Sequence, residues 1–234
     1  MIKLSFARLP GLCAIGLFFA LTGGCSALRP TATPQPSLYS LDSAHSDDRA
    51  ATRMPATLSV VAPTLIVNPP HAASGFDSQR IVYVREAHKL EHFAHSEWVD
   101  TPARMVAPLI VAAIEGGGTF RAVVLTPSAA AGDLRLDTEI MRLQHEFGSQ
   151  PSRVRFTLRA YIVVNATRRV LAWREFDETV AATSEDPYGG VVAANRAVQA
   201  VLEQLASFCQ NAAGNWYSPA TEAQKHSGGG LLGR

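Results

Sequence analysis

The chain has 234 residues, and its 21 basic and 20 acidic side chains give a formal net charge of +1 at pH 7. This balance excludes a basic surface of the kind that binds nucleic acid or an anionic membrane. The length is sufficient for one domain with a sizeable hydrophobic core together with flanking tails.

The N-terminal segment has the layout of an export signal. Two basic residues precede an apolar run over residues 9–21, which at about 13 residues is shorter than the roughly 20 that a membrane-spanning helix needs. Small residues then precede Cys25. The arrangement resembles the lipobox of bacterial lipoproteins, in which the signal is cleaved before a cysteine that carries a diacylglyceryl group, although Thr22 stands where a lipobox has an aliphatic residue. We expect a signal over residues 1–24 and lipidation of Cys25; the alternative is an ordinary cleaved signal with an incidental cysteine.

Cleavage before Cys25 removes Lys3 and Arg8 and leaves 19 basic and 20 acidic side chains, so the mature chain stays nearly neutral. It also removes Cys13, and acylation of Cys25 leaves Cys209 as the one free thiol. A single thiol cannot form an internal disulfide, even in an oxidising compartment. Cys209 lies in an apolar helical pattern, which predicts a small core residue rather than a nucleophile.

Residues 25–55 are predicted to be a tether. Residues 29–37 are rich in proline and hydroxyl side chains, and they have too little apolar surface to offset the entropy cost of ordering. The island at 38–42, Leu-Tyr-Ser-Leu-Asp, interrupts this composition. It is a candidate for docking on the folded domain.

The folded domain is expected over residues 56–210. In its first half the pattern predicts strands over 57–62, 80–85 and 120–125 and a helix over 101–115. Thr101-Pro102 is a typical helix start, and Pro108 predicts a kink or a later start. Residues 86–98 are compatible with either a hairpin arm or a helix.

The second half of the domain has the pattern of antiparallel strands followed by a helix. Strands are predicted over 134–140, 153–164 and 169–176, where apolar and charged residues alternate so that one face is buried and the other is wet. A helix from 187–190 to about Phe208 carries an apolar stripe at three- and four-residue steps, and residues 211–234 are expected to be disordered. We therefore predict an α+β fold, with one mixed, largely antiparallel sheet and two main helices packed on it.

Several features follow one another in a fixed order. They are Cys25, the proline-rich tether, Tyr39-Ser40-Leu41-Asp42, a strand ending at Ala62-Pro63, the Ile81-Val82-Tyr83 strand, an aromatic hairpin leading to Trp98 with a helix behind it, the arginine-rich strand pair, the Arg174-Glu175-Phe176 strand and the Ala-rich last helix. This order resembles the ABC-type transport auxiliary lipoproteins of the Pqi and Mla-like lipid-transport systems, over residues 25–210. The displaced lipobox, Pro108 and the long glycine-rich tail depart from the pattern of that family.

The resemblance implies a fold similar to the N-terminal domain of TolB and to anticodon-binding-like folds. It implies a non-enzymatic protein without a cofactor or a bound metal, anchored by lipid in the outer membrane and facing the periplasm. The partner that the resemblance implies is the MCE-domain protein of an ABC transporter system. The resemblance is also compatible with a homo-oligomer, and binding of nucleic acid is not expected. A lipoprotein that binds a small ligand or has a structural role in the envelope is an alternative from another class.

One motif favours an enzyme instead. His88-Lys89-Leu90-Glu91-His92 matches the H-x-x-E-H pattern of inverted zinc hydrolases, with His95 nearby as a third ligand. That chemistry requires both histidines on one face of a helix, whereas a hairpin arm places positions 88 and 92 roughly 13 Å apart. We favour the hairpin, and keep a periplasmic zinc hydrolase using His88, Glu91 and His92 as the enzymatic alternative. Gly116-Gly117-Gly118 follows a helix rather than preceding one, so it indicates a helix stop and not a phosphate loop.

Six arginines lie on the predicted antiparallel strands among acidic residues: Arg135, Arg153, Arg155, Arg159, Arg169 and Arg174. The simpler interpretation is a solvated sheet face with cross-strand charge pairs, each contributing roughly a few tenths of a kcal/mol. The functional interpretation is a polar docking surface for a partner. For such a surface we select Tyr83 and Trp98 as aromatic anchors and Arg155 and Arg174 as polar contacts.

We predict that Cys25→Ser releases the protein from the membrane into the soluble periplasm, because each buried methylene of an acyl chain contributes about 0.8 kcal/mol of membrane binding. Ser26 follows the cysteine, and by resemblance to lipoprotein sorting a serine there favours the outer membrane. Cell fractionation with immunoblotting measures the outcome. A variant that stays in the membrane fraction like the unsubstituted protein would contradict the anchor.

Overall fold

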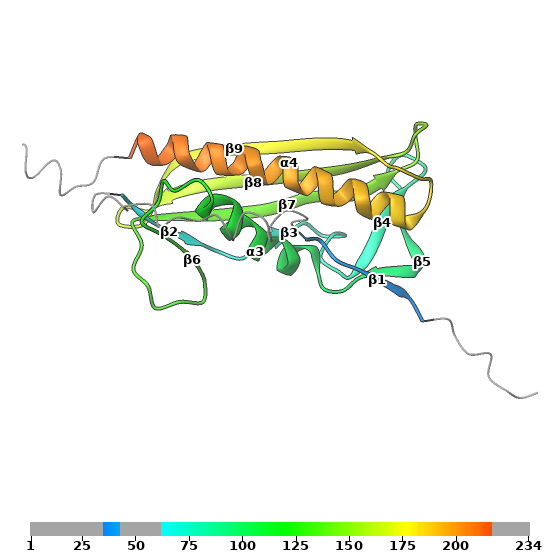
Figure 1. The fold of residues 1–234 in the computed structure, drawn as a ribbon, viewed down its shortest axis with the longest axis horizontal. Helices are drawn as coiled ribbons and strands as arrows, with labels where there is room; N and C mark the ends of the chain where they lie inside the picture. Colours follow the sequence, from blue (N-terminus) through cyan, green and yellow to red (C-terminus); the bar gives the residue numbers. More distant parts are fainter. Residues whose placement is uncertain (1–34, 43–61, 217–234) are drawn as a thin grey trace, which may run out of the picture. The chain divides into compact units, whose positions relative to one another are not determined.

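The structure, a computed structural model, describes residues 35–42 and 62–216. Within these residues the chain forms a nine-stranded mixed sheet and two helices, which confirms the predicted α+β fold (Figure 1). The elements are β1 (Ser37–Tyr39), β2 (Thr64–Val67), β3 (His71–Ala72), β4 (Arg80–Val84), β5 (Glu91–Trp98), α3 (Pro102–Glu115), β6 (Ala122–Leu125), β7 (Leu134–Glu146), β8 (Arg153–Val164), β9 (Arg169–Ala181) and α4 (Pro187–Gly214).

Some sequence predictions fall on residues that lie outside the described ranges. These are the signal segment with Cys25, most of the tether, the tail beyond residue 216 and, apart from Ala62, the strand expected over 57–62. The described strand nearest to that expectation is β2, which begins after Pro63 rather than ending before it.

The long strand β7 is the centre of the sheet. β8 pairs antiparallel with β7, and β9 pairs antiparallel with β8. The other edge of β7 is shared by three short parallel strands, with β2 beside residues 134–136, β3 beside 139–140 and β4 beside 145–146. β6 extends the sheet next to β2, while β5 and then β1 extend it next to β4. The sheet therefore forks at β7, with β6 at one end and β1 at the other (Figure 1).

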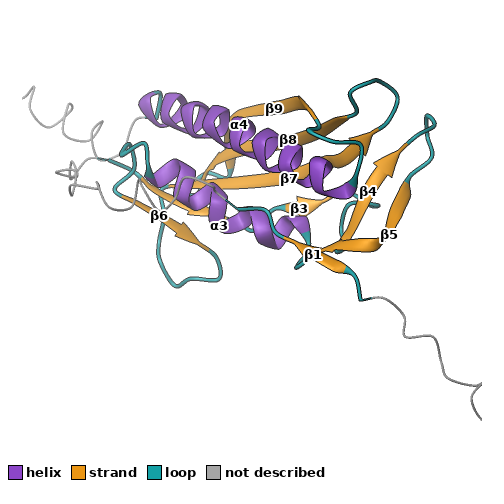
Figure 2. Ribbon diagram, turned by 45° about the vertical axis from the view of Figure 1, so that its right-hand side comes forward, coloured by secondary structure: helices purple, strands orange, loops and turns teal. Residues whose placement is uncertain are grey.

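Both helices lie on one face of this sheet (Figures 1 and 2). The alternation of β8 explains why, because Phe156, Leu158 and Ile162 are fully buried on that face. α4 packs on β8 and β9, and α3 packs on α4 and β6. The opposite face of β7, β8 and β9 carries the charged residues of the alternating pattern, and no helix of the described residues covers it.

The shorter helix, α3, starts where the sequence predicts. It begins at Pro102, directly after Thr101, and ends before Gly116. Proline is accommodated in the first turn because the amide there has no partner within the helix. Pro108 lies inside α3, so the proline does not delay the start. Within the described ranges, neither α3 nor α4 is long and apolar enough to cross a membrane.

The longer helix, α4, is capped by Asp186, whose side chain accepts a hydrogen bond of 2.7 Å from the Gly189 amide. The predicted apolar stripe is confirmed except at its last residue, Phe208, which is half-buried. The other side chains of the stripe are buried against the sheet: Val191, Ala194, Val198, Val201, Leu202 and Leu205. The helix continues to Gly214, beyond the predicted end near Phe208. Ala212 and Ala213 are buried one turn after Cys209 and continue the stripe.

A buried histidine lies under the start of α4. His145 of β7 is 2% exposed, and its Nε2 lies 2.8 Å from the hydroxyl of Ser152. The amide of Ser152 donates a 2.8 Å hydrogen bond to Glu185, just before the helix. Gly190 permits this close approach, because a Cβ there would lie 2.5 Å from His145 Nδ1. The histidine and the helix start are therefore packed as one unit.

We predict that Leu205→Ala lowers the free energy of unfolding by about 2–5 kcal/mol, because truncating a fully buried leucine removes apolar burial and leaves a cavity. Leu205 is fully buried between α4 and the sheet. Denaturant unfolding measures the loss. Arg196→Ala, at an exposed position of the same helix, is the control, and equal stability of both variants would show that this stripe does not anchor the helix.

We also predict that the domain loses stability as the pH falls below about 6.5. Burial lowers the pKa of His145, against the opposing effect of the Glu185 and Asp186 carboxylates. The unfolded chain binds a proton near the ordinary pKa of about 6.5, whereas the native state binds it only at lower pH, so stability is complete above that value and decreases below it. Thermal unfolding at about pH 7.5 and about pH 5.5 measures the difference, which should be smaller in His145→Gln. An unchanged difference in that variant would assign the pH dependence to other groups.

Candidate docking surface

The zinc hypothesis requires a helix over residues 86–98, and the structure forms a hairpin there instead. His88 lies in the turn with φ of +68°, while Glu91 and His92 are consecutive residues of β5, opposite β4. Consecutive side chains of a strand point to opposite faces of the sheet, so Glu91 and His92 do not lie on one side together as zinc binding by this motif requires. The residues described contain no group of three or more His, Cys, Asp or Glu side chains that could hold a metal ion.

Two potentially reactive groups are enclosed in the core. Burial raises the pKa of the Cys209 thiol to about 12, whereas a reactive cysteine needs a lowered pKa and access to solvent. Cys209 is therefore a packing residue, as its helical pattern predicts. The His145–Ser152 pair has the spacing of a base and a hydroxyl nucleophile, but both side chains are buried and a substrate has no access to them.

The uncovered side of β7, β8 and β9 is the open face, defined here by the residues that alternate with the core positions. They are Arg135, Asp137 and Glu139 of β7, Arg155, Thr157, Arg159 and Tyr161 of β8, and Trp173, Glu175, Asp177 and Thr179 of β9. These residues are neighbours because β8 pairs with β7 and with β9 along nearly its whole length, with one register shift in each ladder, between Ile140 and Arg142 and between Ile162 and Val163. The open face is thus an extended polar surface on a rigid sheet.

Ion pairs order the side chains of the open face. Arg159 and Glu175 lie directly opposite each other, with 2.8 Å between Nη2 and Oε2. Arg155 lies 3.7 Å from the carboxylate of Asp177, which also accepts a 2.7 Å hydrogen bond from the hydroxyl of Thr157. Exposed pairs contribute little to stability. Their consequence is a frame of charged groups held in fixed positions around the strands.

A stacked aromatic pair, of which Trp173 is the exposed member, lies within this polar frame. Tyr161 and Trp173 are cross-strand neighbours whose rings stack with centroids 6.4 Å apart and an interplanar angle of 27°. Trp173 is 63% exposed, and Val170 nearby on β9 is 50% exposed. A large apolar side chain surrounded by polar groups is typical of the centre of a protein–protein contact. The open face around Trp173 is therefore the best candidate docking surface.

Sequence reasoning did not select Tyr161 or Trp173, although a signal was present. Both occupy charged-face positions of the alternation and lie at similar distances from the turn at 165–168. Antiparallel pairing across that turn makes them neighbours. The alternation alone predicts a strand over residues 169–176, and it does not distinguish an exposed aromatic side chain from a buried one.

The four residues selected from the sequence do not form one surface. Arg155 is on the open face, but Arg174 pairs with the buried Ala160 and so lies on the helix-bearing side, with its guanidinium 5.1 Å from the ring centroid of Phe176. Trp98 is 3% exposed and belongs to the core. Its choice as a surface anchor is corrected by this burial, since an aromatic residue at the end of a hairpin can equally fill the space under a helix.

Tyr83 belongs to a separate aromatic cluster near the β4–β5 hairpin. Its ring lies 4.6 Å from Phe93 and 5.9 Å from Phe147 between centroids, and the guanidinium of Arg85 lies 4.9 Å from its centroid. The cluster is half-buried. Tyr83 thus holds the hairpin on the end of β7 and exposes only part of its ring, which makes it a weaker anchor than Trp173.

Comparisons with known proteins agree with this architecture. Across residues 39–206 the chain matches the family model described as ABC-type transport auxiliary lipoprotein component. A crystal structure of a Xanthomonas campestris protein aligns with a TM-score of 0.62 and 20% identity, covering 78% of this chain and 96% of that one. A second crystal structure, of an uncharacterised protein, aligns with a TM-score of 0.55 and 10% identity, covering 76% of this chain and 97% of that one. No curated protein matches the sequence.

At these identities the two structures establish a shared fold. The family match establishes more, because it extends from the β1 strand at Tyr39 to within α4 and so includes nearly all the described elements. It agrees with the resemblance inferred from the order of the motifs. The chain therefore belongs to the ABC-type transport auxiliary lipoprotein component family.

Proposed function

We propose that this protein is a non-enzymatic, lipid-anchored subunit of an ABC-driven lipid transport system, and that it acts by binding the MCE-domain protein of that system through the open face. The observation that carries the proposal is the exposed Trp173, stacked on the half-buried Tyr161 within a frame of ion pairs, in a chain that belongs to an auxiliary transport family.

The chemistry of the described side chains supports a role by contact. The motif considered for zinc lies in a hairpin, the one His–Ser pair is buried, and Cys209 is enclosed. What the described domain offers to other molecules is a broad, rigid, polar sheet face with an aromatic centre. Such a surface suits recognition of a folded protein, where a few central aromatic residues account for most of the binding energy.

Transport of lipid between two membranes explains why such a subunit is needed. Acyl chains cost about 0.8 kcal/mol per methylene to expose to water, so lipids require an enclosed apolar path across the periplasm. In the systems that this chain resembles, MCE-domain proteins form that path and the auxiliary lipoprotein meets its far end. Lipidation of Cys25, with Ser26 favouring the outer membrane, would hold the domain where that end arrives.

We predict that Trp173→Ala weakens binding of the soluble domain, residues 36–216, to the periplasmic part of its MCE-domain protein by at least about tenfold, because truncating a central aromatic anchor costs roughly 2 kcal/mol or more. Trp173 is largely exposed, so the variant should keep its thermal stability. Leu90→Ala, an exposed apolar residue of the β4–β5 hairpin, is the matched control. Co-purification and titration calorimetry measure the affinities.

The two variants also distinguish the two surfaces. If Leu90→Ala weakens binding and Trp173→Ala does not, the hairpin is the contact and the open face is not. A deletion strain should show increased sensitivity to detergent, since the outer-membrane barrier depends on lipid supply. Absence of any association, together with an unaltered barrier, would refute the transport function.

A further inference from the structure

We infer that residues 37–42 are a strap that binds the folded domain next to its membrane tether and thereby orients the domain, with the β1–β5 end toward the anchoring membrane and the Trp173 end away from it. The inference rests on the proposed lipid anchor at Cys25. It assigns to the strap a function that the composition of the tether does not indicate.

The backbone of the strap is bound to the sheet. β1 pairs in parallel with the last residues of β5, with Ser37 beside Ser96 and Tyr39 beside Trp98. The amide of Val99 then donates a 2.8 Å hydrogen bond to the carbonyl of Tyr39. A segment that composition assigns to a flexible tether is thus the edge strand of the folded domain.

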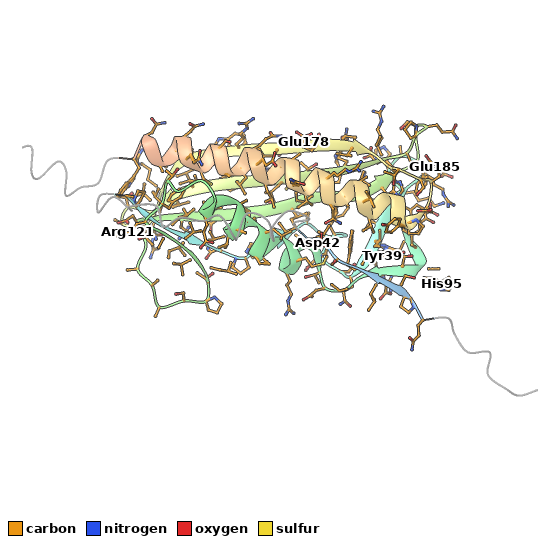
Figure 3. The ribbon with its side chains drawn as sticks, viewed as in Figure 1. Tyr39, Asp42, His95, Arg121, Glu178 and Glu185 are labelled. Atoms are coloured by element: carbon orange, nitrogen blue, oxygen red, sulfur yellow. The ribbon has the colours of Figure 1, made fainter. Side chains whose placement is uncertain are left out.

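Side chains bind the strap to α4 as well. Leu41 is 5% exposed and is part of the hydrophobic core. The side-chain amide of Asn195 on α4 binds the strap twice, because its Oδ1 accepts a 2.8 Å hydrogen bond from the Asp42 amide and its Nδ2 donates a 3.2 Å hydrogen bond to the Ser40 carbonyl. The ring of Tyr39 lies 6.5 Å from that of Tyr188 between centroids. Figure 3 shows Tyr39 and Asp42 along the N-terminal half of α4.

The place of the strap in the fold gives the domain a direction. The strap lies at the end of the sheet that contains the β4–β5 hairpin, and the turn between β8 and β9 lies at the other end (Figure 1). Trp173 of β9 pairs with Tyr161 of β8, which in turn pairs with Asp137 near the start of β7. The part of β7 from Asp137 to Glu146, where β4 pairs, spans about 30 Å. The candidate docking surface is therefore remote from the point where the tether leaves the domain.

The number of residues between the anchor and the strap determines how strongly the strap restricts the orientation of the domain. Eleven residues separate Cys25 from Ser37, which limits the distance between the two to about 37 Å. Without the strap, 36 residues would separate Cys25 from Ala62, and the limit would be about 120 Å. Docking thus shortens the longest possible link between the anchor and the domain about threefold, which favours an orientation with the Trp173 end away from the anchoring membrane.

Energy transfer to lipid-borne acceptors tests the orientation. The lipidated full-length protein is reconstituted in phosphatidylethanolamine–phosphatidylglycerol vesicles, with a dye on His95→Cys at the strap end or on Ala166→Cys in the β8–β9 turn. Both positions are exposed, and Cys209 is buried with its pKa raised to about 12, so it does not compete for the dye. We expect at least twofold higher transfer from position 95 than from position 166. Equal transfer from the two positions would overturn the inference.

A strap variant and its control complete the test. Leu41→Ala combined with Asn195→Ala removes the core contact and both amide hydrogen bonds, and the ratio of the two transfer values should fall toward one. Gln199→Ala, another amide one turn along α4 that pairs with Glu203, should leave the ratio unchanged. A ratio that survives release of the strap would overturn the inference.

The strap can also be tested without the membrane. Amide hydrogen exchange over residues 37–42 should be slowed at least tenfold in the unsubstituted protein relative to the strap variant, and fast exchange in both would refute the strap itself. Flotation of the vesicles reports the anchor separately. A protein that does not float but protects residues 37–42 would refute the anchor and the orientation, and leave the strap as a contact within the fold.

Discussion

The structure depends on the burial of the apolar stripe of α4 against β8 and β9. Removal of apolar side chains from water is the dominant favourable term in folding, and an isolated hairpin of two strands is at best marginally stable. The dimensions match, because the 28 residues of α4 extend about 42 Å and the 13 residues of β9 extend about 43 Å. One helix therefore covers the long strands from end to end.

Among the described residues the helices cover one side of the sheet, and this explains the chemistry of the other side. The residues that alternate with the buried ones must be compatible with water, so the strands carry arginines and carboxylates there. Their ion pairs are exposed and add little stability. Trp173 is different, because neither solubility nor packing requires a largely exposed tryptophan. The proposed docking role accounts for this exposed aromatic side chain on a polar sheet face.

The sequence alone determined the elements whose pattern is local. The period of two in β7 and β8 and the three- and four-residue steps in α4 record which side of each element is buried, so the α+β class and the main elements follow from them. Thr101-Pro102 located the start of α3 in the same way, since capping is decided by neighbouring residues. The order of the motifs along the chain was sufficient to identify the family.

Only the tertiary structure decided which distant residues meet. Strand register depends on pairing and on irregularities such as the shift between Ile162 and Val163, and a displacement of one residue moves every side chain to the other face. Register therefore placed Trp173 beside Tyr161 and put Arg174 on the helix-bearing side. The burial of Trp98 and the docking of residues 37–42 likewise depended on where α4 lies. The local sequence pattern cannot predict that a residue is buried under a helix more than 80 residues away in the sequence.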